Sequence, residues 1–335
     1  MGTDYGPGEI VLGALQAVDA YGCEVVLVGD ENQIKEELIR NKALDNPKVF
    51  IQNATEVIAM DEHPGIAVKT KKNASIVVAT HLLHAQECDA LVSSGSTGAA
   101  VAAALFGLGR IKGIERPSIA TPIPNIKGTT VLLDSGAKVD AKPEQMVQSA
   151  IMGSIYAELL LNLKKPRVGL LNIGEEETKG NEQALATYPL LKAEQSVNFI
   201  GNVEGRDINS GKVDVVVCDG FVGNVVLKVS EGLAVAIVTL LKEALLNGGL
   251  LAKLGALMIK QALKGLQKKL DASEYGGALL LGVKAPFIIC HGSSKAKAIK
   301  NAVRVAVEMT EKDVVGRIGA EIAHENNTRV EKDDQ

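Results

Sequence analysis

The sequence contains no tryptophan, and aromatic residues make up only 3% of its 335 residues. Proteins that bind single-stranded nucleic acid stack bases on aromatic side chains, and nucleic-acid binding in general requires a positively charged surface. The formal net charge of this chain is −4. Both shortages argue against nucleic acid as a partner.

Cysteine is also scarce, and long apolar runs are absent. The four cysteines, Cys23, Cys88, Cys218 and Cys290, are far apart and form no CxxC pair. We therefore expect buried thiols in a reducing cytosol, with neither a disulfide nor a metal site. No uninterrupted apolar run reaches 18 residues, which predicts that no segment spans a membrane. The N-terminus has no basic stretch followed by an apolar one, so it does not resemble a signal peptide.

Several nucleotide-binding and hydrolase motifs are missing. The dinucleotide motif GxGxxG is absent, because the glycines from Gly107 to Gly113 have a different spacing. The P-loop, HExxH and GxSxG motifs are absent too. These absences argue against a Rossmann dehydrogenase, a P-loop NTPase, a zincin and an α/β-hydrolase.

The residues that are present favour a large α/β protein. Hydrophobic residues make up 46% of the chain, so the core is sizeable and, with few aromatics, aliphatic. Short apolar runs predict strands at Val25–Val28, Lys48–Ile51, Asp89–Val92, Ser118–Thr121, Thr130–Leu133, Val168–Asn172, Asn198–Gly201, Val213–Cys218 and Pro286–Cys290. Helical patterns lie at Glu9–Tyr21, Ser75–Gln86, Thr97–Leu108, Lys142–Leu161, Gly180–Glu194, Gly223–Leu246 and Ser294–Lys312. This alternation predicts a mostly parallel, doubly wound sheet in a three-layer α/β/α arrangement.

Small and polar residues follow many of the predicted strands. Such loops are Ser93–Gly98, Asp134–Ala137, Asn172–Glu175, Gly201–Glu204, Asp219–Asn224 and His291–Ser294. In open parallel sheets, ligands bind at the carboxyl ends of strands. We therefore expect these six loops to share one cleft.

The loop Ser93–Gly98 is the most informative of the six. It follows a predicted strand and opens a helix, so converging N–H groups, hydroxyls and the helix dipole favour an anion such as phosphate, or a carbonyl oxygen. The alternative is a simple helix cap.

Three further groups have similar double interpretations. Asp219 can orient a cation or hydroxyl, and Asn224 can donate to an oxygen, but an Asx cap explains them as well. Lys179 can reach an anion in the cleft, or its loop can be merely solvated with Asn181 as a cap. His291, after a predicted strand, is the best placed of the five histidines for proton transfer. Structural or surface roles are expected for the other four.

The stretch Leu250–Leu270 has the pattern of a basic amphipathic helix. Lys253 and Lys260 fall on one face, and Leu251, Leu254 and Met258 fall on the other. This pattern suits an anionic membrane surface or a partner helix, whereas the common alternative is packing on the protein's own core.

With these loops in order, the chain resembles the bacterial acyl-acyl-carrier-protein:phosphate acyltransferases, the PlsX family. The similar stretches cover nearly the whole chain: 110–117, 134–144, 169–182, 201–207, 219–228, 275–278 and 291–294. Members of that family usually begin with a strand leading into Asp-Ala-Met-Gly-Gly-Asp. Here Met1-Gly2-Thr3-Asp4 stands at that place, with Asp4 matching the motif. Without the strand, we expect an exposed pairing edge or apolar surface.

The resemblance implies that phosphate attacks an acyl thioester on acyl carrier protein, giving acyl phosphate and the free carrier. It also implies a fold similar to phosphotransacetylases and isocitrate-type dehydrogenases, a homodimer, attachment to the inner face of the cell membrane and a downstream glycerol-3-phosphate acyltransferase. We expect one catalytic domain over 1–325, a protruding amphipathic helical hairpin at about 240–272, and a charged flexible tail at 326–335.

For this reaction the expected residues divide into three sets, and we expect neither a metal nor a cofactor. The catalytic candidates are His291, Asn224, Asp219 and Lys179. The candidates for phosphate or substrate binding are Ser94, Gly95, Ser96, Thr97, Gly98, Asn181, Gly292 and Ser293. The membrane candidates are Leu251, Leu254, Met258, Lys253 and Lys260. The alternatives are a soluble phosphotransacylase that uses coenzyme A, a non-catalytic scaffold at the membrane surface, and a nicotinamide dehydrogenase.

Overall fold

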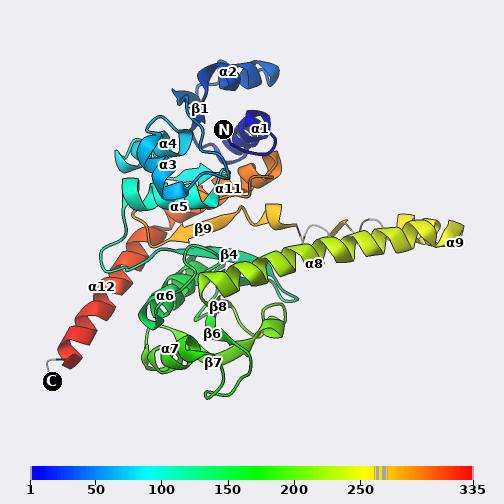
Figure 1. Ribbon diagram of the computed structural model, residues 1–335. Coiled ribbons are helices and arrows are strands. Elements are labelled where there is room, and N and C mark those ends of the chain that lie inside the picture. Colours follow the sequence, from blue (N-terminus) through cyan, green and yellow to red (C-terminus); the bar gives the residue numbers. More distant parts are fainter. Residues whose placement is uncertain (1, 260, 262–263, 266–268, 270, 334–335) are drawn as a thin grey trace.

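The computed structural model describes residues 2–333 except 260, 262–263, 266–268 and 270. Its centre is an eight-stranded sheet with the order β3-β10-β9-β4-β5-β8-β6-β7, and a separate two-stranded sheet holds β1 and β2 (Figure 1). The strands are β1 (Val25–Gly29), β2 (Val49–Asn53), β3 (Leu91–Ser93), β4 (Ser118–Pro124), β5 (Thr129–Leu133), β6 (Arg167–Asn172), β7 (Asn198–Glu204), β8 (Val215–Val217), β9 (Ala278–Leu281) and β10 (Phe287–Ile289).

Helices cover both faces of the large sheet. They are α1 (Pro7–Tyr21), α2 (Glu31–Arg40), α3 (Pro64–Thr70), α4 (Ser75–His84), α5 (Thr97–Ala103) with its π-helical extension η1 (Ala104–Leu108), α6 (Pro143–Leu160), α7 (Glu182–Ala193), α8 (Gly220–Asn247), α9 (Gly249–Met258), α11 (Ala296–Glu311) and α12 (Val314–Asp333). The short turns η2 (Gly205–Asp207) and η3 (Ala272–Glu274) complete the described elements. The predicted α/β class with three layers is confirmed.

The sheet is mostly parallel, but not throughout. Four neighbouring pairs are parallel: β3–β10, β5–β8, β8–β6 and β6–β7. The pairs β10–β9, β9–β4 and β4–β5 are antiparallel. Because three reversals lie between β10 and β5, the strands β3 and β10 run opposite to β5, β8, β6 and β7. The sequence analysis did not identify β9, which takes part in two of these reversals.

Alternating side chains of the central strands sort the core into layers. In β4, Ala120 joins the cluster beneath α6, α7, α11 and α12. Ile119 and Ile123 point to the other face, where two separate clusters form. Ile119 packs with residues of α4, α5 and η1, whereas Ile123 packs beneath the first turns of α8. On this second face, α4, α5 and η1 therefore pack at one hydrophobic cluster and α8 packs at the other. The part of the sheet between the two clusters belongs to neither.

The chain forms two lobes (Figure 1). The N-terminal lobe holds β1–β3, α1–α5, β10 and α11, and the other lobe holds β5–β8, α6 and α7. In the first lobe α1 lies against α11 so closely that a Cβ on Gly13 would come within 2.6 Å of the carbonyl oxygen of Ala296. Within the described residues, β1 pairs only with β2, and β3 is an outer strand of its sheet. Each of these two strands therefore has one edge without a paired strand among the described residues.

A helical arm projects from the body (Figure 1). The first turns of α8 pack on the sheet through Val226 and Leu227, whereas the helix from Lys228 onward, with α9 at its end, stands free. We call residues 228–258 the arm. Its exposed apolar side chains include Val229, Leu233, Val235, Ile237, Leu240, Leu254, Leu257 and Met258.

The arm corrects two expectations. It begins well before residue 240, because α8 continues past the sheet. By length and composition, α8 can also cross a membrane, and its apolar window is wholly exposed. The sequence search required an uninterrupted apolar run, which Lys228, Glu231, Lys242 and Glu243 break. Lys260 lies outside the described residues, as do the side chains of Leu251 and Lys253.

Two smaller expectations also change. Cys218 and Cys290 are buried, but Cys23 and Cys88 are only half-buried, so the prediction of four buried thiols is wrong for those two. The described part of the charged tail, residues 326–333, continues helix α12.

Candidate functional site

The polar loops predicted to share one cleft lie in two groups. The loops after β3 and β10 lie at one edge of the sheet, whereas those after β5, β6 and β8 lie at the other. The prediction assumed that all these strands run in the same direction, and the reversals around β9 contradict that assumption. The predicted loop Gly201–Glu204 is instead the end of strand β7. We call the two sets the β3/β10 group and the β5/β8 group.

The β3/β10 group contains the serine-rich loop. Ser94 is 8% exposed, while the side chain of Thr97 faces solvent. Ser96 is the N-cap of α5, and its hydroxyl accepts a hydrogen bond from the amide of Ala99 at 3.4 Å. A Cβ on Gly98 would come within 2.6 Å of Cγ of Pro64, so close packing against α3 explains this glycine. The alternative of a capped helix start therefore holds for Ser96, and Gly95 and Thr97 remain available to a ligand.

His291 lies in the same group, on the loop after β10. Its Nδ1 lies 2.7 Å from the hydroxyl of Ser293 and accepts a hydrogen bond from the amide of Ser293 at 3.2 Å. Because Nδ1 accepts from that N–H, the neutral ring carries its proton on Nε2. The imidazole is exposed, so this Nε2–H is free to donate. The amide of Asp4 donates to the carbonyl of Gly292 at 3.0 Å, which brings the matching aspartate of the N-terminal motif to this loop.

The β5/β8 group is built around the carboxylate of Asp134. This side chain is 3% exposed and accepts hydrogen bonds from four amides, those of Ile119, Gly136, Ala137 and Lys138, at 2.9–3.1 Å. Burial raises the pKa of the Asp134 carboxyl, and the four N–H groups oppose that rise. The carboxylate thus folds the loop after β5 around itself. The sequence analysis included this loop but assigned Asp134 no role, although an aspartate directly after a buried strand is a signal for such a turn.

The first turn of α8 rests on this loop. Asp219 is the N-cap, and its Oδ1 accepts from the amides of Phe221 and Val222 at 2.9 and 3.0 Å. The amide of Gly220 donates to the carbonyl of Lys138 at 2.8 Å. A Cβ on Gly223 would lie 1.9 Å from the carbonyl oxygen of Asp134, so only glycine fits there. The capping alternative therefore holds for Asp219.

Asn224 follows this tight contact and is exposed. A Cβ on Gly136 would lie 3.8 Å from the side chain of Asn224, so the amide stands beside the loop after β5. Asp219 makes no hydrogen bond to Asn224 or His291 among the contacts of the described residues, which leaves its expected orienting role without a contact.

Lys179 and Asn181 belong to the same edge. Asn181 caps α7, because its Oδ1 accepts from the amide of Ala184 at 2.9 Å. Asn172 donates to the carbonyl of Lys179 at 2.9 Å and so ties the end of β6 to this loop. The side chain of Lys179 crosses Gly174 and is exposed. Its ammonium is therefore free to meet an anion that enters from this edge.

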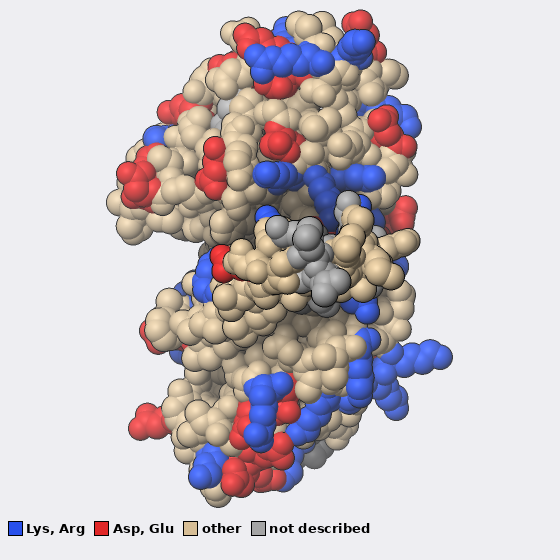
Figure 2. All heavy atoms as spheres, turned by 90° about the vertical axis from the view of Figure 1, so that its right-hand side faces the viewer, with Lys and Arg blue, Asp and Glu red and all other residues tan. Residues whose placement is uncertain are grey.

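Both groups border the same face of the sheet. Thr121 points to the face of Ile119 and Ile123, between their two clusters, and its hydroxyl lies 2.6 Å from that of Ser135. Since α5 follows β3 and α8 follows the oppositely directed β8, the two helices begin at opposite ends of this polar interval. Figure 2, which views the molecule with the arm toward the reader, shows the surface hollowed between the lobes, next to the projecting arm. The hollow separates the lobes that carry the two groups.

The buried thiols near the site are poor nucleophiles. Burial, helped by the charges of Asp219 and Asp134, raises the pKa of Cys218 well above its ordinary value. Burial also raises the pKa of Cys290 to about 12. Both thiols therefore stay protonated at neutral pH. Among the described residues, no group of three or more His, Cys, Asp or Glu side chains is arranged to hold a metal ion.

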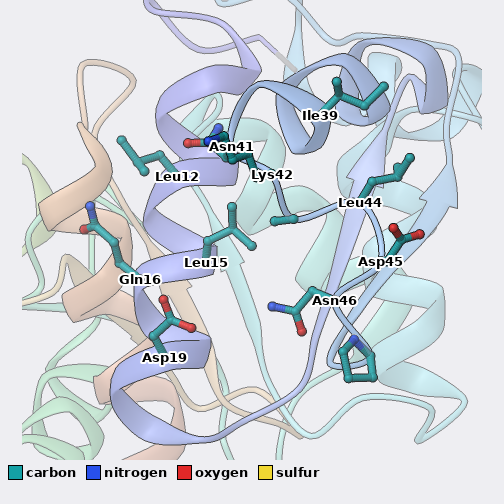
Figure 3. A pocket seen from close by; sticks show the side chains of 12 residues that line it. Leu12, Leu15, Gln16, Asp19, Ile39, Asn41, Lys42, Leu44, Asp45 and Asn46 are labelled. Carbon is teal, nitrogen blue, oxygen red and sulfur yellow. The ribbon is translucent and has the colours of Figure 1, made fainter.

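One cavity lies away from these loops. It measures about 850 Å³ and lies between α1 and the loop that follows α2, with Leu12, Leu15, Ile39 and Leu44 among its walls and Asp19 at one end (Figure 3). It contains no residue predicted for the site. The chemistry of the polar loops, rather than cavity size, therefore identifies the candidate site.

Comparisons with known proteins agree with the resemblance seen in the sequence. The model of the family described as "Fatty acid synthesis protein" matches residues 1–317. The phosphate acyltransferase of Pelotomaculum thermopropionicum is 57% identical over 322 residues, covering 96% of this chain and 93% of that protein. The phosphate acyltransferase of Desulfitobacterium hafniense strain Y51 is 57% identical over 323 residues, covering 96% and 95%. The structure of a phosphotransacetylase from Streptococcus pyogenes matches with a TM-score of 0.62 over 92% of each chain at 15% identity, which establishes the likeness of fold.

Proposed function

The chain belongs to the family of fatty acid synthesis proteins, and we propose that it is a phosphate acyltransferase that converts acyl-acyl carrier protein and inorganic phosphate to acyl phosphate and free acyl carrier protein. The observation that carries the proposal is the 57% identity, over nearly the whole chain, to proteins named phosphate acyltransferase. The exposed side chains of His291 and Asn224, each with a hydrogen-bond donor, support it.

Phosphate is itself a competent nucleophile, so the reaction needs no acyl-enzyme. An oxygen of phosphate attacks the thioester carbon, a tetrahedral oxyanion forms, and the C–S bond breaks to give acyl phosphate and a thiolate that takes up a proton. The protein must bring the reactants together and stabilise the oxyanion. The protonated thiols of Cys218 and Cys290 agree with direct attack.

We assign residues of both groups of loops to phosphate and to the thioester. Ser94 to Gly98, with Gly292 and Ser293, bind phosphate, and the Nε2–H of His291 donates to the thioester oxygen or protonates the departing thiolate. The amide of Asn224 is the second candidate for the thioester oxygen, and the ammonium of Lys179 neutralises phosphate. Asn181 and Asp219 support these side chains by capping α7 and α8. The assignments require the hollow to close until both ends reach one thioester.

The arm supports the further proposal of a homodimer attached to the inner face of the cell membrane. Apolar side chains such as Leu233, Leu240 and Met258 are 59%, 65% and 87% exposed. Contiguous exposed apolar surface marks contact with a membrane or another protein. A second copy and an anionic bilayer can share the arm, each covering part of it. The acyl phosphate product suits a downstream glycerol-3-phosphate acyltransferase. We assign residues 1–325 to one catalytic domain.

The test is incubation with long-chain acyl-acyl carrier protein and phosphate, with detection of acyl phosphate. His291→Ala and Asn224→Ala should each lower kcat by about 100-fold to 1000-fold, the usual loss for an oxyanion donor. Acyl-coenzyme A in parallel separates this function from a soluble phosphotransacylase. Wild-type protein that forms no acyl phosphate from either donor contradicts the function, and full activity in both variants contradicts the two assignments.

A further inference from the structure

We propose that Gln145 is a positioning residue, which acts through Lys138 on the first turn of α8 and so on Asn224. This inference rests on the function proposed above. Gln145 lies in the first turn of α6, is 8% exposed, and had no role in the sequence analysis. Its side-chain contacts connect the loop before β4 to the loop after β5.

The amide of Gln145 stands between two opposite charges. Its Oε1 accepts a hydrogen bond from the ammonium of Lys138 at 2.6 Å and another from the amide of Lys142 at 3.1 Å. Its Nε2 donates to the carboxylate of Glu115 at 2.8 Å. The amide dipole is therefore aligned, with oxygen toward the cation and N–H toward the anion. Glu115 lies on the loop before β4, so the hydrogen bonds of Gln145 connect that loop to Lys138.

Lys138 is held at three points. Its amide donates to Asp134 at 2.9 Å, its carbonyl accepts from the amide of Gly220 at 2.8 Å, and its ammonium is held by Gln145. Gly220 is the first residue of α8. The backbone of Lys138 thus contacts the first residue of α8, and its side chain binds to Gln145 of α6.

The loop after β5 and the first turn of α8 are closely packed. A Cβ on Gly220 would lie 2.3 Å from the carbonyl oxygen of Lys138, and one on Gly223 would lie 1.9 Å from that of Asp134. A shift of this loop must therefore move the first turn of α8. Asn224 is the next residue, so its amide moves as well.

The variant that tests this is Gln145→Met, which keeps the side chain's length and removes all three of its side-chain hydrogen bonds. A small misplacement of a reacting group can cost about 100-fold in rate, and we expect kcat to fall about 10-fold to 100-fold. The KM for phosphate should stay within about twofold, because the side-chain hydrogen bonds of Gln145 reach neither Lys179 nor the loops after β3 and β10 that are assigned to phosphate.

Gln148 provides a matched control. It lies one turn further along α6, is 7% exposed, accepts from the amide of Glu115 at 2.9 Å and donates to the carbonyl of Gly113 at 2.9 Å. It holds the same loop but makes no hydrogen bond to Lys138 among the contacts of the described residues. Gln148→Met should destabilise the protein to a similar degree and leave kcat within about twofold.

A double-mutant cycle with Asn224→Ala gives the decisive reading. If Gln145 acts through Asn224, Gln145→Met should cost little further activity once Asn224 is alanine. If Gln145 merely supports the fold, the fold-loss is the same in both backgrounds. The second result overturns the proposal, as does equal loss of kcat in the Gln145 and Gln148 variants.

Two measurements keep the outcomes separate. Gln145→Glu retains the acceptor for Lys138 and should therefore have a higher kcat than Gln145→Met. It also replaces Gln145→Met if that variant does not fold. A kcat no higher than that of Gln145→Met contradicts the proposal. Hydrogen exchange at the Gly220 amide should quicken in Gln145→Met and not in Gln148→Met, whether or not the chain is active. Wild-type protein without acyl phosphate formation refutes the proposed function and the positioning role with it. Active wild type with unaltered exchange and kcat in Gln145→Met refutes the positioning role alone.

Discussion

Asp134→Asn should strongly destabilise the protein, whereas Asp219→Asn should not. Both carboxylates are buried, at 3% and 9% exposure, and both accept backbone N–H groups at the start of a turn. They differ in how their oxygens are used. Asp219 accepts its two hydrogen bonds with Oδ1, so an amide oxygen can replace it. Asp134 uses Oδ1 for three amides and Oδ2 for that of Lys138.

The magnitude follows from this difference. In Asp134→Asn, the oxygen can keep three hydrogen bonds, but the amide nitrogen then faces the N–H of Lys138, and two donors meet. A lost hydrogen bond to a charged group costs about 1.5–3 kcal/mol, and an unsatisfied buried donor adds to it. We expect a loss of about 2–4 kcal/mol for Asp134→Asn. For Asp219→Asn we expect less than about 0.5 kcal/mol, since asparagine caps helices as well as aspartate.

Thermal unfolding of the two variants beside wild type measures this. At about 2 °C per kcal/mol for a chain of this size, the Asp134 variant should lose about 4–8 °C in Tm and the Asp219 variant about 1 °C. Equal losses in the two variants, or an unchanged Tm in Asp134→Asn, refute the claim that the carboxylate organises the loop after β5.

Three further predictions use other parts of the molecule. Lys179→Ala should raise the KM for phosphate by about 10-fold with little change in kcat, and steady-state kinetics with an unchanged phosphate dependence contradict its role. Replacing Leu254 and Met258 by Glu should release the protein from anionic vesicles without loss of soluble turnover, and unchanged co-sedimentation rejects the membrane role of the arm. Burial raises the pKa of Asp214, but hydrogen bonds and charge from Arg167 outweigh it and lower that pKa below its ordinary value. The pair therefore stabilises the fold above about pH 4 and loses this contribution as the pH falls through the lowered pKa. We expect the free energy of unfolding of Asp214→Asn, measured by denaturation, to lie below that of the wild type at pH 6. This difference should shrink toward pH 3.

Much of the fold follows from local sequence patterns, and strand direction does not. The apolar runs predicted nine of the strands within a few residues, because buried strands of a covered sheet are continuously apolar. The periodicity of apolar residues carries no information on the direction of a strand in its sheet. The antiparallel pairs around β9 therefore could not be predicted from it. Residues Ala278–Leu281 are only four and follow two glycines with positive φ, Gly276 and Gly277, which made them resemble a loop.

Some missed elements had a readable signal. In α2, the buried Ile34 and Leu38 are four residues apart behind the N-cap Asp30. In α12, the buried Val314, Ile318 and Ile322 follow the same spacing. Both patterns are typical of amphipathic helices.

Most of the polar loops were predictable from the sequence, but their grouping was not. Five of the six predicted loops lie at the ends of strands, whereas Gly201–Glu204 is part of β7, and the topology divides the loops between two edges. Ser96, Asn181 and Asp219 act as caps in the structure, which is the alternative that the sequence left open. The role of Asp134 depends on amides from β4 and from its own loop, and contacts of that range require the folded chain.

Helix α8 is one continuous rod of 28 residues, about 42 Å long, with Asn224 near its root and exposed apolar surface toward its tip. A force on the tip acts with a long lever arm, so it exerts torque on the root. There Gly220 and Gly223 are packed closely against backbone carbonyls, which restricts the movement of the root. Whatever holds the tip therefore also sets the tilt of the rod, and with it the direction in which Asn224 faces.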